Sequence, residues 1–195
     1  MPAFTFDKIL ERGAALGKLP AKERKSRDWF RTQARKSAIT PKKLQSEAKS
    51  QMVSRVRMGR MYFFAYDPKT KKELPYYDRF PLIFPFKKAD GGFMGINLHY
   101  LPPRLRAKLM DALYGLSTNK RYDESTRLKL NYNVLNGAAR FRFFKPTVKR
   151  YLTSHVRSRF IEVNAEQWDM ALFLPVEQFS KASKQKVWSD SRNGI

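Results

Sequence analysis

The stretch Met61-Tyr-Phe-Phe-Ala-Tyr66 decides the fold, because it carries large apolar or aromatic side chains at nearly every position. Such a short apolar run predicts a strand that is buried on both faces. After a polar turn at 67–72, the chain continues as Leu74-Pro-Tyr-Tyr-Asp-Arg-Phe-Pro-Leu-Ile-Phe-Pro-Phe86. Pro81 and Pro85 predict that this second segment is an edge strand or an extended stretch, since proline cannot donate a hydrogen bond within a central strand.

Further along the chain, the triplet Asp90-Gly91-Gly92 predicts a hairpin turn, and residues 93–98 are expected to return as a strand. Together these segments predict a small, aromatic-rich antiparallel β-meander at about 58–99. A helix is expected after it, with one apolar stripe formed by Leu105, Leu109, Leu113 and Leu116. The sequence therefore predicts an α+β fold in which helices flank the meander.

Capping residues mark helix boundaries on both sides of the meander. Thr40 before Pro41 predicts an N-cap followed by proline at the first helical position. Asp123 predicts the cap of a later helix that Gly137 would end. Asn164 predicts the cap of a further short helix.

The chain is expected to divide into a basic helical N-terminal extension at 1–57 and an α+β core at 58–195 that ends in a basic tail. Residues 1–60 hold 16 Lys and Arg against 5 Asp and Glu, an excess of 11 positive charges. The candidate helices of this block, one of them at 21–36, have narrow apolar faces. Such faces indicate that the helices dock on another surface.

The whole chain carries 40 Lys and Arg against 17 Asp and Glu, a formal net charge of +23 on 195 residues. This imbalance destabilises the compact state through self-repulsion and is most simply explained by a polyanionic partner. Nucleic acid is the commonest such partner, because each neutralised phosphate releases counterions and adds to affinity. Aromatic residues make up 14% of the chain, too many for a disordered basic tail.

The composition also excludes several classes of protein. There are no cysteines, so disulfides and Cys-based zinc sites are excluded, and the only histidines, His99 and His155, lie far apart. No run of 18 apolar residues is present, and the N-terminus lacks the apolar core of a signal peptide. With no acid cluster at metal-ligand spacing and no Ser-His-Asp arrangement, we expect no membrane association, no cofactor and no enzymatic activity.

The segment 140–160 is the best candidate for a binding surface, because basic residues alternate there with aromatic ones and no acid intervenes. Lys and Arg would contact phosphates, and the aromatic rings could stack on unpaired bases. In the alternative interpretation, the aromatic residues are core and the charges are a solvated face. A second dense run at 22–36 suits either a phosphate backbone or an acidic protein surface. The predicted nucleic-acid contacts are Lys22, Arg24, Lys25, Arg27, Arg31, Arg35, Lys36, Arg140, Arg142, Lys145, Lys149, Arg150, Arg157 and Arg159.

Most of the chain resembles a known family. The resemblance rests on Gly59-Arg-Met-Tyr-Phe-Phe-Ala-Tyr-Asp-Pro-Lys69, on Leu74–Phe84 and on Gly95-Ile-Asn-Leu-His-Tyr-Leu-Pro-Pro-Arg-Leu-Arg106, and Phe141–His155 and Trp188–Arg192 fit it. These segments are similar to small virion proteins of T4-like contractile-tailed bacteriophages, in the DNA end protector and head-completion group. The resemblance implies a structural protein of the virion, present in the host cytoplasm during assembly and without a catalytic motif.

Two functions remain open at this point. In the first, the chain binds packaged double-stranded DNA non-specifically among other virion proteins, and protects its end or completes the head near the portal. In the second, it is a neck, tail or baseplate component whose basic surface contacts acidic proteins. A third class is an RNA-binding protein of ribosomal type. The charge favours the first function, and the narrow apolar faces of the N-terminal helices favour the second.

Overall fold

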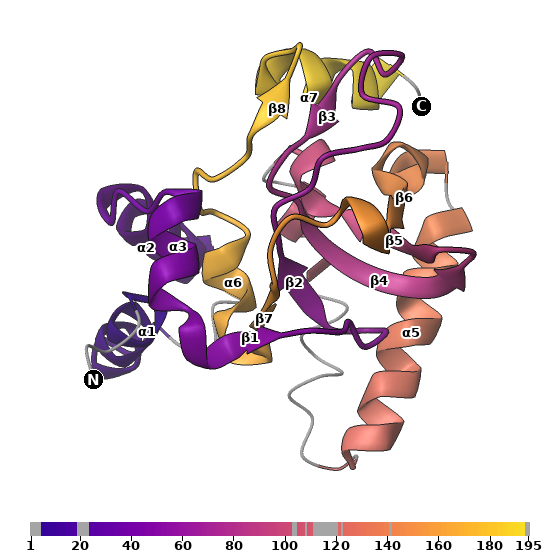
Figure 1. Cartoon of the computed structure of the whole chain (residues 1–195). Coiled ribbons are helices and arrows are strands. Elements are labelled where there is room, and N and C mark those ends of the chain that lie inside the picture. The colour runs from indigo at the N-terminus through magenta and orange to yellow at the C-terminus, as the bar shows by residue number, and fades with distance from the viewer. Residues whose placement is uncertain are drawn as a thin grey trace.

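The computed structural model describes residues 5–18, 24–102, 105–107, 109–110, 121, 123–140 and 142–193. Figure 1 shows its helices and strands. The α-helices are α1 (Thr5–Ala15), α2 (Arg24–Lys36), α3 (Pro41–Glu47), α5 (Glu124–Arg140), α6 (Trp168–Ala171) and α7 (Lys184–Asn193). The strands are β1 (Met52–Val53), β2 (Met61–Phe63), β3 (Tyr77–Asp78), β4 (Leu82–Ala89), β5 (Gly92–Asn97), β6 (Val148–Leu152), β7 (Phe160–Val163) and β8 (Phe179–Ser180). Short 3-10 helices are η1 (Lys49–Gln51), η2 (Leu98–Tyr100), η3 (Arg142–Thr147), η4 (Thr153–His155) and η5 (Ala165–Gln167).

The described strands form one antiparallel sheet in the order β1-β7-β2-β4-β5-β6, and β3 pairs with β8 in a small second sheet. This confirms the predicted α+β class. The predicted meander is present as the neighbouring strands β2, β4 and β5. The sheet is larger than expected, because β6 extends it at one edge, and β7 and β1 extend it at the other.

Pro85 lies inside the central strand β4, so the prediction of an edge strand or an extended stretch was wrong for residues 82–86, whereas Pro81 precedes this strand. Strand β4 pairs with β2 on one side and with β5 on the other. Its pairing with β5 shifts register between Pro85 and Lys87. A bulge accommodates proline in a central strand, because the ladder is interrupted where proline lacks its N–H.

Alternation along the strands divides the core into two parts, one on each face of the sheet. The main core combines one set of strand residues with residues from the helices, and its strand members include Met61, Phe63, Leu82, Phe84, Ile96, Ile161 and Val163. The smaller core on the other face consists of Tyr62, Phe64, Tyr66, Ile83, Phe93, Tyr151 and Phe160. Because Tyr151 and Phe160 are buried here, the core interpretation holds for these two aromatic residues of the segment 140–160.

Helices α2 and α3 dock onto the main core. Phe30 and Ala34 of α2 and Leu44 of α3 are fully buried in it, and α2 packs against α6. Figure 1 shows the N-terminal helices grouped beside α6 at the left of the view, with the long helix α5 at the right and α7 at the top. The narrow apolar faces of α2 and α3 therefore meet a surface within the chain, while a domain boundary at residue 57 stays a prediction.

The predicted helix caps are confirmed. The Thr40 hydroxyl accepts a hydrogen bond from Lys43 N at 3.2 Å, and Pro41 begins α3. The Asp123 carboxylate accepts from Thr126 N at 2.7 Å at the start of α5. Asn164 forms a capping box at η5. Each cap depends on residues three positions apart, so the local sequence is sufficient to specify it.

Two helix ends differ from the predictions. Helix α5 does not stop at Gly137 but continues to Arg140, because a helical glycine costs only about 1 kcal/mol relative to alanine. The expected basic C-terminal tail is largely the helix α7, in which Val187 is fully buried. In the predicted leucine stripe, Leu105 and Leu109 are helical, whereas Leu113 and Leu116 lie outside the described residues.

Replacing Gly92 by alanine is expected to destabilise the fold by at least about 2 kcal/mol. Gly92 pairs with Leu152 where β5 meets β6, and a Cβ atom there would overlap the backbone carbonyl of Tyr151. As a control, Gly137→Ala places its Cβ in open space on α5 and should stabilise by up to about 1 kcal/mol. Urea unfolding followed by circular dichroism measures both changes, and equal midpoints for the two variants would contradict the prediction.

Candidate nucleic-acid interface

The basic residues predicted at 22–36 lie mainly on α2. Lys25, Arg35 and Lys36 are exposed, whereas Phe30 and Ala34 are buried. Arg24 and Arg27 also belong to α2, and Lys22 lies outside the described residues. The helix therefore presents a row of cations outward, as the amphipathic pattern predicts.

Helix α2 also borders a narrow basic notch next to α7. Arg31 and Arg35 line this notch of about 60 Å³ together with Lys184 and Trp188 of α7. The buried Arg106 lies at the same place, with Glu177 as its carboxylate partner. The notch brings cations from the two ends of the chain together, which the sequence pattern did not predict.

The second predicted group of basic residues lies on η3 and on β6, the strand at one edge of the sheet. Lys145 and Arg150 are exposed, and Lys149 is half-buried. The Arg150 guanidinium donates a hydrogen bond to the Asp90 carbonyl at 2.7 Å, which ties β6 to the β4–β5 hairpin. Arg140 ends α5 and Arg142 begins η3.

Arg157 and Arg159 lie on the crossover that leads from β6 to β7 along the smaller core. Tyr66 and Val156 form an isolated bridge, and Arg157 N donates to the Ala65 carbonyl at 2.8 Å. Both arginines are exposed. The Arg159 guanidinium donates to the Met52 carbonyl at 2.6 Å, so the crossover ends at the β1 edge. It therefore carries two cations from one edge of the sheet to the other.

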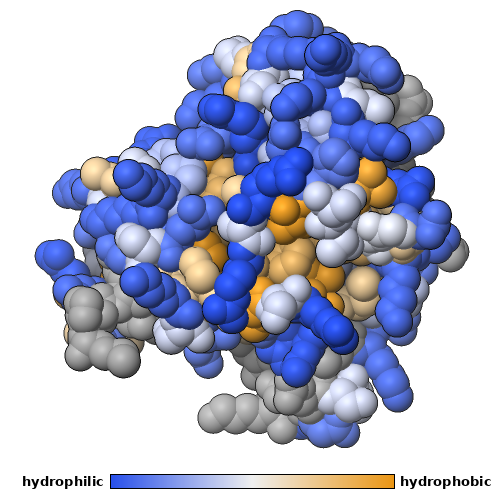
Figure 2. Space-filling model, viewed as in Figure 1, coloured by the Kyte–Doolittle hydropathy of each residue, from blue (hydrophilic) through white to orange (hydrophobic). Residues whose placement is uncertain are grey.

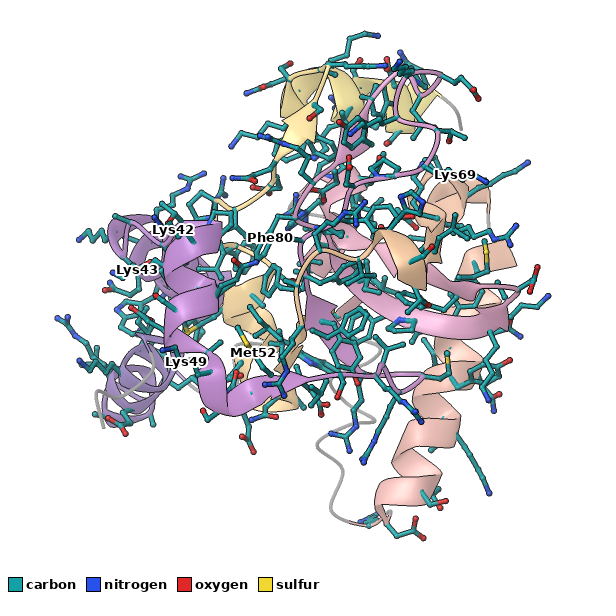
Figure 3. The ribbon with its side chains drawn as sticks, in the orientation of Figure 1. Lys42, Lys43, Lys49, Met52, Lys69 and Phe80 are labelled. Atoms are coloured by element: carbon teal, nitrogen blue, oxygen red, sulfur yellow. The ribbon has the colours of Figure 1, made fainter. Side chains whose placement is uncertain are left out.

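The predicted contacts thus form separate groups rather than one cluster. Figure 3 shows Lys42, Lys43 and Lys49 at the side of the N-terminal helices, while Lys69 lies on the other side of the view. Figure 2 shows hydrophilic residues over most of this face, around a smaller apolar area near its middle. The exposed cations on α2, β6 and the crossover are spread over the surface, and such a distribution suits an extended polyanion better than a small anion.

A pocket of about 530 Å³ lies between β6 and the segment 66–78. Five tyrosines line it, and we call it the tyrosine pocket: Tyr66, Tyr76, Tyr77, Tyr100 and Tyr151. Three cations, Lys69, Lys149 and Arg150, also line it. Its volume lies within the range of roughly 300–1,000 Å³ that is typical of small-ligand sites.

Asp78 and Asn97 form a buried polar network in the wall of this pocket. The Asp78 carboxylate accepts hydrogen bonds from His99 Nδ1 at 2.7 Å and from Asn97 Nδ2 at 3.2 Å. Its other oxygen accepts from Phe80 N at 3.0 Å and Gln178 N at 3.4 Å. His99 is fully buried, so it has a structural role in holding η2 to β3.

Lys149 is the unusual cation of the tyrosine pocket. Its Nζ atom lies 4.1 Å from the centre of the Tyr100 ring, which is a cation–π contact. Burial lowers the pKa of Lys149 to about 8. Among the described residues no carboxylate pairs with this amine, so the fold keeps a costly ammonium group beside the aromatic rings.

Sequence reasoning missed most of this pocket, because its tyrosines come from segments far apart in the chain. Lys69 in this pocket and Lys184 in the notch beside α2 were not among the predicted nucleic-acid contacts. The tyrosines between 62 and 77 were a usable signal, but those at 62 and 66 were assigned to a buried strand and those at 76 and 77 to an edge strand or extended stretch. Of these tyrosines, Tyr62 is indeed fully buried, whereas Tyr76 and Tyr77 are only half-buried at the pocket.

The described residues contain no group of three or more His, Cys, Asp or Glu side chains that could hold a metal ion. No described helix combines the length and apolarity that a membrane span requires.

Comparison with known proteins identifies one family. A family model described as phage T4 terminal DNA protecting protein matches residues 6–192. This range contains all the segments on which the resemblance to T4-like virion proteins rests, and that resemblance is confirmed. No curated protein and no solved structure matches the chain significantly.

Proposed function

The chain belongs to the family of phage T4 terminal DNA protecting proteins, and we propose that it binds the ends of packaged double-stranded DNA. In this proposal it contacts the phosphate backbone with little sequence preference and covers the end by binding, without chemistry of its own. It would act in the virion near the portal, beside other head proteins, after assembly in the host cytoplasm. The observation that carries the proposal is the family match over nearly the whole chain.

The charge distribution supports contact with a polyanion. Even if each of the 17 acids neutralised one base, 23 of the 40 basic residues would keep no acidic partner within the chain. Several acids are already paired, for example Glu162 with Arg60 and Asp190 with Lys186. The exposed cations on α2, β6 and the crossover are therefore available to phosphates, which position a protein without reading sequence.

The direct test is protection of linear duplex DNA from an exonuclease. At a protein concentration about ten times Kd, digestion of the ends should slow about tenfold, because only uncovered ends are cut. A nicked circular duplex, digested by a nick-specific enzyme, controls for general inhibition of nucleases. Unchanged digestion of linear DNA would contradict end protection and favour a neck, tail or baseplate role in contact with acidic proteins.

A further inference from the structure

We propose that the tyrosine pocket takes the terminal nucleotide of a DNA end, with its base against the tyrosine rings and its 5′-phosphate at Lys149. This inference rests on the proposed function, since it names the chemical group that the protein would recognise at the end. The pocket brings five tyrosines and three cations together in one recess of about 530 Å³, whereas the notch beside α2 is only about 60 Å³. Together these groups match the two parts of a nucleoside phosphate.

The other aromatic side chains that the structure describes are buried or half-buried. Leu16 is the one large hydrophobic residue that is exposed within the same part of the chain. For these aromatic rings, stacking on an unpaired base therefore needs a recess. The half-buried rings of Tyr76 and Tyr77 line the tyrosine pocket, and the tightly packed Tyr66 and Tyr151 rings, 4.9 Å apart, support its wall. Duplex bases are stacked on their neighbours, so a frayed terminal nucleotide is the substrate that fits.

Lys149 provides the reason to expect a phosphate. The amine is largely removed from water, sits over the Tyr100 ring and has no carboxylate partner among the described residues. An anion placed in the pocket would compensate its buried charge. Lys69 and the exposed Arg150, which also line the pocket, add two positive charges at the same place.

The acid of the pocket wall does not oppose such an anion. Both oxygens of Asp78 already accept hydrogen bonds, from Phe80 N, Gln178 N, Asn97 and His99. Asp78 is only 4% exposed, so its charge is directed into the protein and compensated there. The tyrosine rings and the three cations are then the groups that line the space for the ligand.

The test compares two substitutions that remove the same charge. Lys149→Met removes the buried amine, whereas Lys87→Met removes an exposed lysine on β4 that was not predicted to contact DNA and does not line the pocket. Thr70→Trp, at an exposed position of the pocket lining, fills the space without changing the charge. The probes are free dAMP, measured by equilibrium dialysis, and hairpin-capped duplexes whose single open end carries a 5′-phosphate or a 5′-hydroxyl.

Wild-type protein should bind dAMP, and it should prefer the phosphorylated end to the hydroxyl end. Lys149→Met should weaken the binding of dAMP and of the phosphorylated duplex end by about 10- to 100-fold, because it removes a charge-assisted contact. Thr70→Trp should weaken both kinds of binding by a similar factor, because it fills the pocket. Lys87→Met should leave dAMP binding unchanged. The melting temperature of Lys149→Met should equal or exceed that of the wild type, because the change removes a buried charge. This measurement separates a role of Lys149 in binding from a role in stability.

The outcomes distinguish this inference from the proposed function. If dAMP does not bind, or if Lys149→Met and Lys87→Met behave alike toward it, the inference about the pocket is wrong. If linear DNA is protected from the exonuclease at the same time, the proposed function stands without the pocket. If dAMP binds at Lys149 but linear DNA is not protected, the pocket is a nucleotide site and the end-protecting function is wrong.

Discussion

Raising the salt concentration from about 50 to about 200 mM will weaken binding to linear duplex DNA about a thousandfold, if six of the predicted cations contact phosphates. The physical reason is counterion release, because each phosphate contact contributes about −0.9 to the slope of log affinity against log salt. Six contacts therefore give a slope of roughly −5. A binding titration at several salt concentrations measures this slope directly.

A charge-matched pair of triple variants locates the contacts. Replacing Lys25, Arg35 and Lys36 of α2 by alanine removes three exposed cations from the predicted surface. This change should flatten the salt slope by up to about three units. The control replaces Lys87, Lys88 and Lys129, which are exposed but were not predicted to contact DNA.

The control variant should bind DNA with nearly the wild-type slope, because it changes net charge equally but leaves the predicted contacts in place. Equal flattening in both variants would mean that the whole protein acts as a diffuse cation, and the assignment of α2 would be wrong. A wild-type slope near zero would instead favour acidic protein neighbours as the partner of the basic surface.

Local signals in the sequence predicted the elements that depend on neighbouring residues. The caps at Thr40, Asp123 and Asn164 and the hairpin at Asp90-Gly91-Gly92 each involve a few consecutive positions. At such positions the types of the neighbouring residues largely determine the local backbone conformation. The α+β class followed from the same signals, because separate sequence patterns predict strands in the middle of the chain and helices before and after them.

Long-range pairing explains what the sequence could not show. Strand β7 pairs with β1 and β2, which lie about a hundred residues earlier, and β6 pairs with β5 across the helix α5. Alternation of Lys149, Arg150 and Tyr151 suits an exposed binding loop as well as an edge strand. The tyrosine pocket has the same origin, because its walls come from 66–78, 97–100 and 148–152. Only the folded chain brings these segments together.

Replacing Arg106 by methionine is expected to destabilise the protein by about 3–5 kcal/mol, because it leaves a buried carboxylate without its partner. Arg106 is 1% exposed, and its guanidinium donates to Glu177 Oε1 at 2.7 Å. It also donates to the carbonyls of Leu101 at 2.7 Å and Leu172 at 2.9 Å. One side chain thus joins the segment after η2 to the segment after α6.

The state of Glu177 supports this expectation. Burial is the largest influence and opposes its ionisation, but the charge of Arg106, a contribution from His99 and the hydrogen bonds to the carboxylate together outweigh it, so that the pKa of Glu177 is lowered. A lowered pKa in the folded state contributes stability above the unfolded pKa, and this stability is lost as the pH falls through the folded value. In the Arg106→Met variant that contribution should disappear, so the variant should lose less stability than the wild type between neutral and acidic pH.

Two further variants make the test specific. The double variant Arg106→Met with Glu177→Leu should recover part of the lost stability, because it removes the unpaired charge and replaces it by apolar contacts. The surface pair of Lys186 and Asp190 is the control, since the Lys186 side chain is 64% exposed. Lys186→Met should cost less than about 1 kcal/mol.

Urea unfolding followed by circular dichroism gives the free energy of unfolding of each variant. If Arg106→Met cost no more than Lys186→Met, the buried pair would not hold the two segments together. The Arg106 guanidinium also donates to the His99 carbonyl at 3.3 Å, and the Trp188 indole donates to the same carbonyl at 2.8 Å. Loss of the arginine should therefore loosen α7 and η2 together, and with η2 the Tyr100 wall of the tyrosine pocket.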